Sequence, residues 1–165
     1  MSVPPDWLPS LILLDDHGGN WERYIEAVYD VFERDFVLSK PLFQGQRLGL
    51  KRHPFDQGKE VTFWHMTSEG DREAERLPDL RRCERIGWVR AIIEHSDDPL
   101  VKAWENQRGS ESRLCLWLEQ HEYLVVLAKR RSYTLPWTAY TVTKPHQKRK
   151  QQKDYERYIK TRAAP

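Results

Sequence analysis

Residues 113–142 read RLCLWLEQHEYLVVLAKRRSYTLPWTAYTV, and this stretch decides the fold. It contains three apolar runs, Arg113–Leu118, Tyr123–Lys129 and Tyr133–Val142, joined by connections of four and three residues. Connections this short favour antiparallel neighbours, so the pattern predicts a three-stranded meander. The middle run is apolar on both faces, which is typical of a central strand covered on each side. Pro136 interrupts the last run and indicates an edge position or a bulge.

Two helices are predicted upstream of this meander. Asn20 is a good N-cap, and the apolar residues from Trp21 to Phe36 recur at spacings of three and four, as on one face of a helix. A second stripe with this spacing runs from Leu77 to Ile93, and its opposite face carries four arginines: Arg81, Arg82, Arg85 and Arg90. We expect both segments to be amphipathic helices that cover the sheet.

Shorter elements are expected around these helices. The segments Gln46–Lys51 and Glu60–Met66 flank the turn residues Asp56-Gln57-Gly58, and the second segment is rich in β-branched and aromatic residues. This arrangement predicts a β-hairpin. Leu100–Trp104 is predicted as a short helical turn, and the polar residues 106–111 are predicted as a loop.

The end of the chain is strongly basic. From Lys144 onward there are eight lysines and arginines against two acidic residues, a net charge of +6. Because the whole chain carries +2, the first 143 residues carry −4. A helix is predicted over Gln147–Arg162, and this asymmetry favours an anionic partner at that end. The candidate RNA-binding residues of this tail are Lys148, Arg149, Lys150 and Lys153.

The length of 165 residues is that of about one domain. The predicted class is α+β, with N-terminal helices packed on a mainly antiparallel sheet of about five strands and a C-terminal basic helix. We assign residues 1–143 to a single domain and residues 144–165 to the basic helical tail.

Composition and motifs exclude several classes of protein. The two cysteines, Cys83 and Cys115, lie among apolar neighbours without metal-ligand spacing, so we expect reduced core thiols and no metal site. The N-terminus lacks a basic signal region, and the apolar run Leu11–Leu14 is too short for a membrane span, so a cytoplasmic protein is expected. Phosphate-binding glycine loops and the common hydrolase motifs are absent from the sequence, and no cofactor is expected.

His65 is the first candidate for catalysis. It closes the run predicted as a strand and leads directly into Thr67, which places an imidazole where a strand meets a loop. Histidine titrates near neutral pH and therefore suits proton transfer. The alternative interpretation is a partly buried, hydrogen-bonded and inert histidine beside Trp64.

The turn after the central strand supplies the second group of candidates. Lys129, Arg130 and Arg131 end that strand, while Thr138 and Tyr140 alternate onto one face of the next, so cations and hydroxyls are expected to converge there. Arginine and hydroxyl groups suit a phosphate ligand. The alternative is a solvated turn whose charges only discourage edge pairing.

Two arginines of the second predicted helix, Arg82 and Arg90, are candidates for a secondary phosphate-binding face. Three acidic residues lie within helical reach of these arginines: Asp79, Glu84 and Glu94. A structural role in ion pairs on the helix surface is therefore the alternative.

Several short motifs together resemble a known family. They are Phe63-Trp64-His65, the segment from Asp71-Arg72 to Arg82, Arg85–Arg90, Trp117-Leu118-Glu119, Val125–Leu127, Arg131–Leu135 and Thr138-Ala139-Tyr140. This set resembles the phage-associated branch of the barnase/EndoU/colicin/RelE-like ribonucleases over roughly Phe36 to Val142. The resemblance implies helices followed by a small antiparallel sheet, and RNA cleavage without metal, often as a toxin in bacterial conflict systems.

The resemblance also implies residue roles. His65 would act as acid or base, Arg131 as the phosphate-binding cation, and Thr138 with Tyr140 as the polar pair of the last strand. The Pro136-Trp137 pair inside that strand departs from the expected pattern.

Two further hypotheses stand beside the metal-independent endoribonuclease. The chain can instead be a non-catalytic nucleic-acid-binding module that uses the basic tail helix. Alternatively, the tail is an interaction arm for a protein, such as an acidic antitoxin or immunity protein. A lipid partner is not expected, because the basic helix has few large apolar residues.

Overall fold

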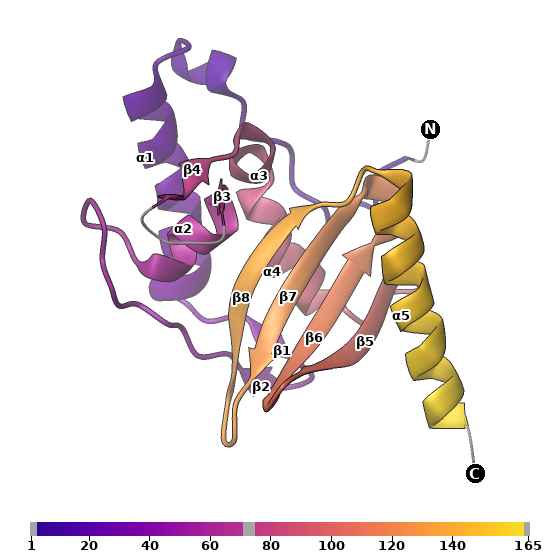
Figure 1. The fold of residues 1–165 in the computed structure, drawn as a ribbon. Coiled ribbons are helices and arrows are strands. Elements are labelled where there is room, and N and C mark those ends of the chain that lie inside the picture. Colours follow the sequence, from indigo (N-terminus) through magenta and orange to yellow (C-terminus); the bar gives the residue numbers. More distant parts are fainter. Residues whose placement is uncertain (1–2, 71–74, 164–165) are drawn as a thin grey trace.

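The meander predicted from residues 113–142 forms the centre of the structure. A computed structural model describes residues 3–70 and 75–163 and places four antiparallel strands in the order β5-β6-β7-β8 (Figure 1). Their bounds are Val101–Arg108, Glu111–Leu118, Tyr123–Lys129 and Thr134–Thr141. The predicted α+β class and the antiparallel meander are confirmed.

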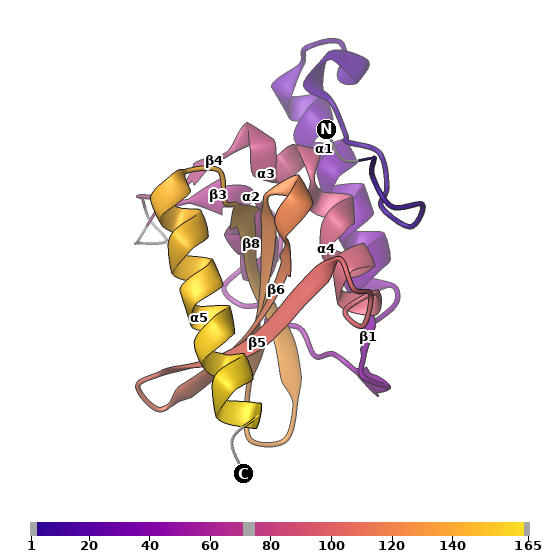
Figure 2. The same cartoon turned by 90° about the vertical axis from the view of Figure 1, so that its right-hand side faces the viewer.

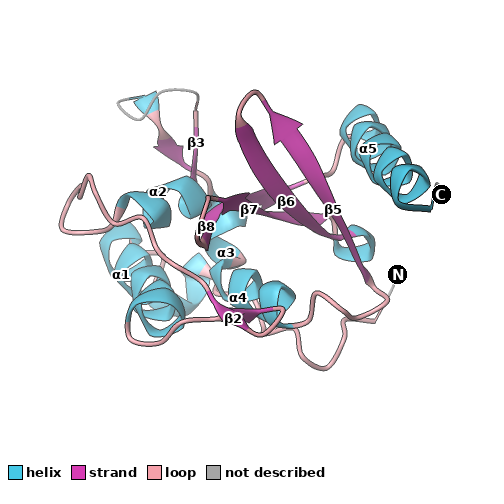
Figure 3. Cartoon of the chain, turned by 90° about the horizontal axis from the view of Figure 1, so that it is seen from below, coloured by secondary structure: helices cyan, strands magenta, loops and turns pink. Residues whose placement is uncertain are grey.

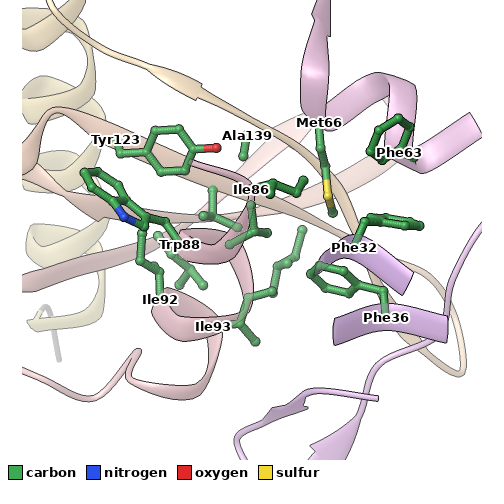
Figure 4. Close-up of a cluster of buried hydrophobic side chains, with 14 of the residues drawn as sticks. Phe32, Phe36, Phe63, Met66, Ile86, Trp88, Ile92, Ile93, Tyr123 and Ala139 are labelled. Atoms are coloured by element: carbon green, nitrogen blue, oxygen red, sulfur yellow. The ribbon is translucent and has the colours of Figure 1, made fainter. Parts of the chain in front are cut away.

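The two faces of this sheet are covered by different helices. Tyr123, Val125 and Leu127 of β7 point into the main core, which Figure 4 shows packed with Phe32, Phe36, Met66 and Ile86 from the helical layer. Leu124 and Val126 belong to a second cluster that Trp104 and Trp117 share on the opposite face. The predicted central strand covered on each side is therefore confirmed.

The first predicted helix is present. Helix α1 spans Trp21–Phe32 and continues as a π-helical turn, η2, over Glu33–Val37. The Asn20 side chain accepts a hydrogen bond from the backbone N–H of Arg23, so the predicted N-cap is confirmed. A short 3-10 turn, η1 (Leu14–His17), precedes it.

The second predicted helix is divided into two. Strand β4 (Leu77–Pro78) precedes helix α3 (Leu80–Glu84), and helix α4 (Ile86–Glu94) follows after a break at Arg85. The N-terminal segment helps to end α3, because the backbone N–H of Ile12 donates to the carbonyl oxygen of Glu84. Periodicity cannot detect such a break, since the apolar spacing continues through it.

The strand predicted over Glu60–Met66 is wrong, because this segment is the helix α2 (Val61–Thr67). Six of its seven residues are buried, and the Thr67 hydroxyl donates to the carbonyl oxygen of Phe63 one turn earlier. A short apolar run does not distinguish a strand from a buried helix, and tertiary packing here overrides the β-propensity of its aromatic and branched residues.

The turn next to this helix exists without the predicted hairpin. Asp56 and Lys59 form an isolated antiparallel bridge around Gln57 and Gly58, which have φ values of 52° and 74°. The nearby hairpin is instead β1 (Leu42–Phe43) with β2 (Gln46–Arg47). A second two-residue pair joins β3 (Ser68–Glu69) to β4.

The helical turn predicted over Leu100–Trp104 is also wrong, because these residues open β5. Val101 lies in the main core and Trp104 in the cluster on the other face, so the segment buries both sides as a strand does. The predicted loop over residues 106–111 shrinks to a tight turn between β5 and β6. The edge position or bulge predicted from Pro136 is confirmed, because β8 is an edge strand whose register shifts opposite Val126 and Leu127.

The basic tail forms helix α5 (Pro145–Ala163), which packs against β5 on the face of the sheet opposite the other helices (Figures 2 and 3). Tyr155 and Tyr158 contact the Trp104–Trp117 cluster. Cys83 and Cys115 are both buried, as predicted, and burial raises the pKa of the Cys83 thiol to about 12. Across residues 3–70 and 75–163, every helix is too short or too polar to cross a bilayer.

Candidate functional site

Helix α2 lies along the outer edge of β8 and is tied to it by hydrogen bonds. The Thr138 hydroxyl donates to the carbonyl oxygen of His65 at 2.8 Å. Arg82 from α3 donates through one guanidinium nitrogen to the carbonyl oxygens of His65 (3.3 Å) and Ser68 (2.6 Å). The last carbonyls of a helix lack partners within it, so these donors fix the end of α2 and the position of His65.

A pocket of about 370 Å³ opens beside these contacts. Four of the predicted site residues line it, although they come from α2, α3 and β8: His65, Arg82, Thr138 and Tyr140. The remaining lining residues are Glu69, Gly70, Arg76 and Trp137. Two arginines against one carboxylate make the pocket net positive.

His65 is only 4% exposed, and it lines the wall of this pocket. Its ring centroid lies 5.2 Å from that of Trp137 with a tilted geometry. The predicted alternative neighbour, Trp64, points elsewhere and donates its indole N–H to the carbonyl oxygen of Asp56. The predicted setting of His65 at a strand end is wrong, yet the end of α2 still delivers it to the edge of a strand.

Thr138 and Tyr140 lie on one face of β8, opposite Val126 and Leu124 of β7. The Arg82 guanidinium lies 5.5 Å from the centroid of the Tyr140 ring, within the range of a cation–π contact. The pairing skips one residue between Pro136 and Thr138, so Trp137 is the extra residue of a bulge. Bulges re-aim side chains, and this one supplies the pocket wall beside His65.

Trp137 is surrounded by cations from three separate segments. Arg113 lies 4.6 Å from its ring centroid, and Lys51 and Arg130 each lie at 5.5 Å. Glu111 pairs with Arg113 and with Arg130. The hydrogen bond and charge of Arg113, with a smaller contribution from the charge of Arg130, hold the pKa of the Glu111 carboxyl below its usual range. Part of the positive charge next to the pocket is therefore already balanced.

Of the four residues predicted to act in catalysis, Arg131 does not line the pocket. It is exposed in the turn between β7 and β8. Arg131 precedes β8. Even Thr134, the first residue of β8, is four residues from Thr138, or about 13 Å at a strand rise of about 3.3 Å per residue, so the strand separates Arg131 from Thr138. Arg76 and Arg82 are the arginines that occupy the pocket in its place.

The other predicted cations are dispersed. Lys129 pairs with Glu105 at 3.6 Å. Arg90 pairs with Glu94 and donates to the carbonyl oxygen of Asp35, which ties α4 to the π-helical turn after α1. Arg90 therefore has a structural environment away from the pocket.

The cations of α5 are exposed or locally paired. Lys148 pairs with Glu122 at 2.6 Å and Lys150 with Asp154 at 3.1 Å. Within the part of the chain that the structure describes, Arg149 and Lys153 are exposed and make no ion pair; both line a shallow concavity on this helix. Lys150 also lines a pocket of about 150 Å³ that shares Trp137, Thr138 and Tyr140 with the larger one, so α5 reaches the neighbourhood of His65.

Sequence reasoning missed four lining residues: Glu69, Gly70, Arg76 and Trp137. Gly70 has φ of +134°, and a Cβ there would lie 3.2 Å from the Cα of Arg76, so only glycine fits this close approach. The resemblance pointed to this segment through Asp71 and Arg72, which lie outside the described residues. Arg76 was inside that motif but had no distinguishing spacing.

The described residues contain no cluster of three or more His, Cys, Asp or Glu side chains that could hold a metal ion.

No protein-family model matches the chain, and no curated protein or solved structure gives a significant match. Function is therefore inferred from the side chains that line the pocket.

Proposed function

We propose that this chain is a metal-independent endoribonuclease that cleaves RNA in the pocket at the edge of β8. The observation that carries the proposal is the convergence of His65, Arg82, Thr138 and Tyr140, from three separate elements, on one pocket of about 370 Å³. These residue types are the ones that a metal-free cleavage of a phosphodiester requires. The resemblance to the barnase/EndoU/colicin/RelE-like group, which implies roles for three of these residues, also implies the same activity.

The proposed reaction is an internal transfer at phosphorus. The ribose 2′-oxygen loses its proton and attacks the adjacent phosphorus, and the bond from phosphorus to the 5′-oxygen breaks. That oxygen receives a proton, so the products carry a 2′,3′-cyclic phosphate and a 5′-hydroxyl. Among the lining residues, His65 and Glu69 are the acid–base side chains that we assign to these two proton transfers.

The cations and hydroxyls of the pocket serve the phosphate. Negative charge grows on its non-bridging oxygens as the bond to the 2′-oxygen forms, and fixed donors aimed at that charge lower the barrier. Arg82 is held in place by its bonds to His65 and Ser68 and by Asp79 at 3.6 Å. Tyr140 is aligned by the strand, whereas the Thr138 hydroxyl already donates to the carbonyl oxygen of His65 and so positions that residue. Such pre-organised donors require little rearrangement during the reaction.

The test compares wild type with His65→Gln on a mixed-sequence RNA in the presence of EDTA. Gln keeps much of the volume of the buried ring and can hydrogen bond, but it cannot exchange protons near neutral pH. We expect the wild type to cleave RNA and spare DNA of the same sequence, and His65→Gln to lose cleavage with an unchanged circular dichroism spectrum. Intact RNA after incubation with folded wild type would remove the proposal.

A non-catalytic RNA-binding module is the second candidate, favoured by the exposed Arg149 and Lys153 on α5. In that case wild type would bind RNA without cleaving it, and His65→Gln would leave the affinity for RNA unchanged. The net positive pocket would also accept carboxylates from an acidic antitoxin or immunity protein, the partner expected if the enzyme belongs to a phage or bacterial conflict system.

A further inference from the structure

A second pocket lies directly behind the first. It has a volume of about 330 Å³ and shares both His65 and Arg76 with the pocket at the β8 edge. Its other walls come from α1, from the turn around Asp56 and from α2. Ligands in the two pockets would therefore have His65 and Arg76 as shared neighbours.

The walls of this second pocket are aromatic. Trp21 at the start of α1 and Trp64 on α2 both line it, and Trp21 is 40% exposed. Two prolines, Pro54 and Pro78, add further rigid apolar surface. Surfaces of this kind accept flat ring systems, because rings stack on indole with little dependence on their identity.

One of the two aromatic walls, Trp64, is fixed by a hydrogen bond. The Trp64 indole N–H donates to the carbonyl oxygen of Asp56 at 3.0 Å. The turn that holds Asp56 is closed by paired backbone bonds with Lys59 at 2.9 and 3.0 Å, and the backbone N–H of Val61 donates to Arg52 at 2.9 Å. This side of the pocket is thus formed before any ligand binds, which favours selective binding.

Three further lining residues are polar and suit the edge of a heterocycle, while Ile25 and Val61 extend the apolar surface. Asp56, Gln57 and Ser68 line the pocket with hydrogen-bonding groups. Its volume of about 330 Å³ falls at the small end of the range for ligand pockets, about 300–1,000 Å³. A flat, apolar ring with hydrogen-bonding edges matches these walls in size and in chemistry.

We propose that this pocket binds the base of the nucleotide next to the scissile phosphate, so that it selects single-stranded RNA by its unstacked base. The inference rests on the proposed function, since it needs an RNA phosphate in the adjoining pocket. Base pairing would hold the ring inside a duplex, so a strand must be unpaired before its base can enter between Trp21 and Trp64. His65 and Arg76 then lie between the bound base and the reacting phosphate.

Trp21→Ala tests this proposal with a readout that does not need catalysis. Binding of the four 3′-nucleoside monophosphates and of inorganic phosphate is measured by calorimetry on the full chain. We expect Trp21→Ala to lower the affinity for the nucleotide that wild type prefers by about 10- to 100-fold. The affinity for inorganic phosphate should remain unchanged. Trp21→Phe keeps a stacking ring and should retain most of the affinity, and Tyr133→Ala removes an exposed aromatic residue that does not line the pocket.

The cleavage assay separates the two proposals. If the wild type leaves RNA intact but Trp21→Ala still loses nucleotide affinity, the base pocket stands and the catalytic assignment fails. If the wild type cleaves RNA, and Trp21→Ala cleaves it with the same base preference and the same nucleotide affinity, the base pocket is overturned and catalysis stands. The base pocket is also overturned if wild type binds nucleotides and inorganic phosphate with equal affinity.

Discussion

Helix α5 and the pocket at the β8 edge are both basic, but they are built in opposite ways. In α5 the charges are dense in sequence, and Lys148 and Lys150 are already paired with carboxylates. In the pocket, His65, Arg76 and Arg82 are far apart in sequence or lie on different elements, and folding brings them together. The difference teaches that charge density along a chain indicates a polyanion, whereas convergence in space indicates where chemistry can occur.

The two regions should also respond differently to a ligand. Side chains of α5 act through a field that salt screens, because most of them are exposed. Arg82 is only 13% exposed at its side chain and is fixed by backbone carbonyls, so its effect on a phosphate is local and poorly screened. Variants in the two regions can therefore separate binding from catalysis.

The largest expected effect comes from His65. We predict that His65→Gln lowers the rate of RNA cleavage at saturating substrate by about 10²- to 10⁴-fold, because general acid or base catalysis contributes that much. The measurement is kcat from initial rates at fixed salt. The matched variant replaces Lys148, Arg149, Lys150 and Lys153 by glutamine and should keep kcat within a few fold. A similar loss of kcat in both variants would erase the distinction between the regions.

Arg82 is expected to show the next largest effect. We predict that Arg82→Met lowers the free energy of unfolding by about 2–4 kcal/mol, because two hydrogen bonds from a charged donor disappear and the Ser68 carbonyl loses this donor. Urea denaturation measures this change, and the cleavage rate should fall with it. Arg81→Met is the control, since Arg81 is the exposed neighbour on the same helix. Equal stability of the two variants would mean that Arg82 does not hold α2.

The α5 variant should change binding rather than chemistry. Replacing Lys148, Arg149, Lys150 and Lys153 by glutamine is predicted to raise KM and to reduce the slope of log affinity against log salt by at most about three, because each single-strand phosphate contact contributes about 0.7. Filter binding to single-stranded RNA across a salt series measures the slope. An unchanged slope would show that α5 does not contact the phosphates.

The smallest effect is expected at Asp35, which lies outside both regions and is 5% exposed. Burial raises the pKa of its carboxyl, against the opposing effect of Arg34. A raised folded-state pKa means that the stabilising contribution is complete below the unfolded pKa and is lost as pH rises through the folded value. Asp35→Asn should therefore gain stability relative to wild type on going from acid to neutral pH, without altering cleavage. Denaturation at both pH values checks the sign, and a relative loss at neutral pH contradicts it.

Strong local patterns made much of the fold predictable from the sequence. The meander, the covered strand β7, the bulge near Pro136 and the Asn20 cap each depend on a few neighbouring residues, and all are present. The α2 helix was missed because a seven-residue segment with six buried residues has no period that separates helix from strand. Its conformation depends on packing against β8 and α3, which are distant in the chain.

The candidate site was only partly predictable, for a related reason. Thr138 and Tyr140 were identified because alternation along a strand places them on one face, and the structure puts them in the pocket with His65. Arg131 was selected because it is close to them in sequence, but strand length separates it from them. Arg76 enters the pocket through the approach of its backbone to Gly70, which depends on three-dimensional contact and has no sequence pattern.

The most direct test of the central claim is the chemical identity of the RNA ends. A single-stranded oligonucleotide is incubated with wild type in EDTA, and its products are analysed by mass spectrometry beside those of a fully 2′-O-methylated copy. We predict 2′,3′-cyclic phosphate and 5′-hydroxyl ends from the first and no cleavage of the second, because the 2′-hydroxyl is the proposed nucleophile. Products with 3′-hydroxyl and 5′-phosphate ends, or cleavage of the methylated copy, would contradict this account.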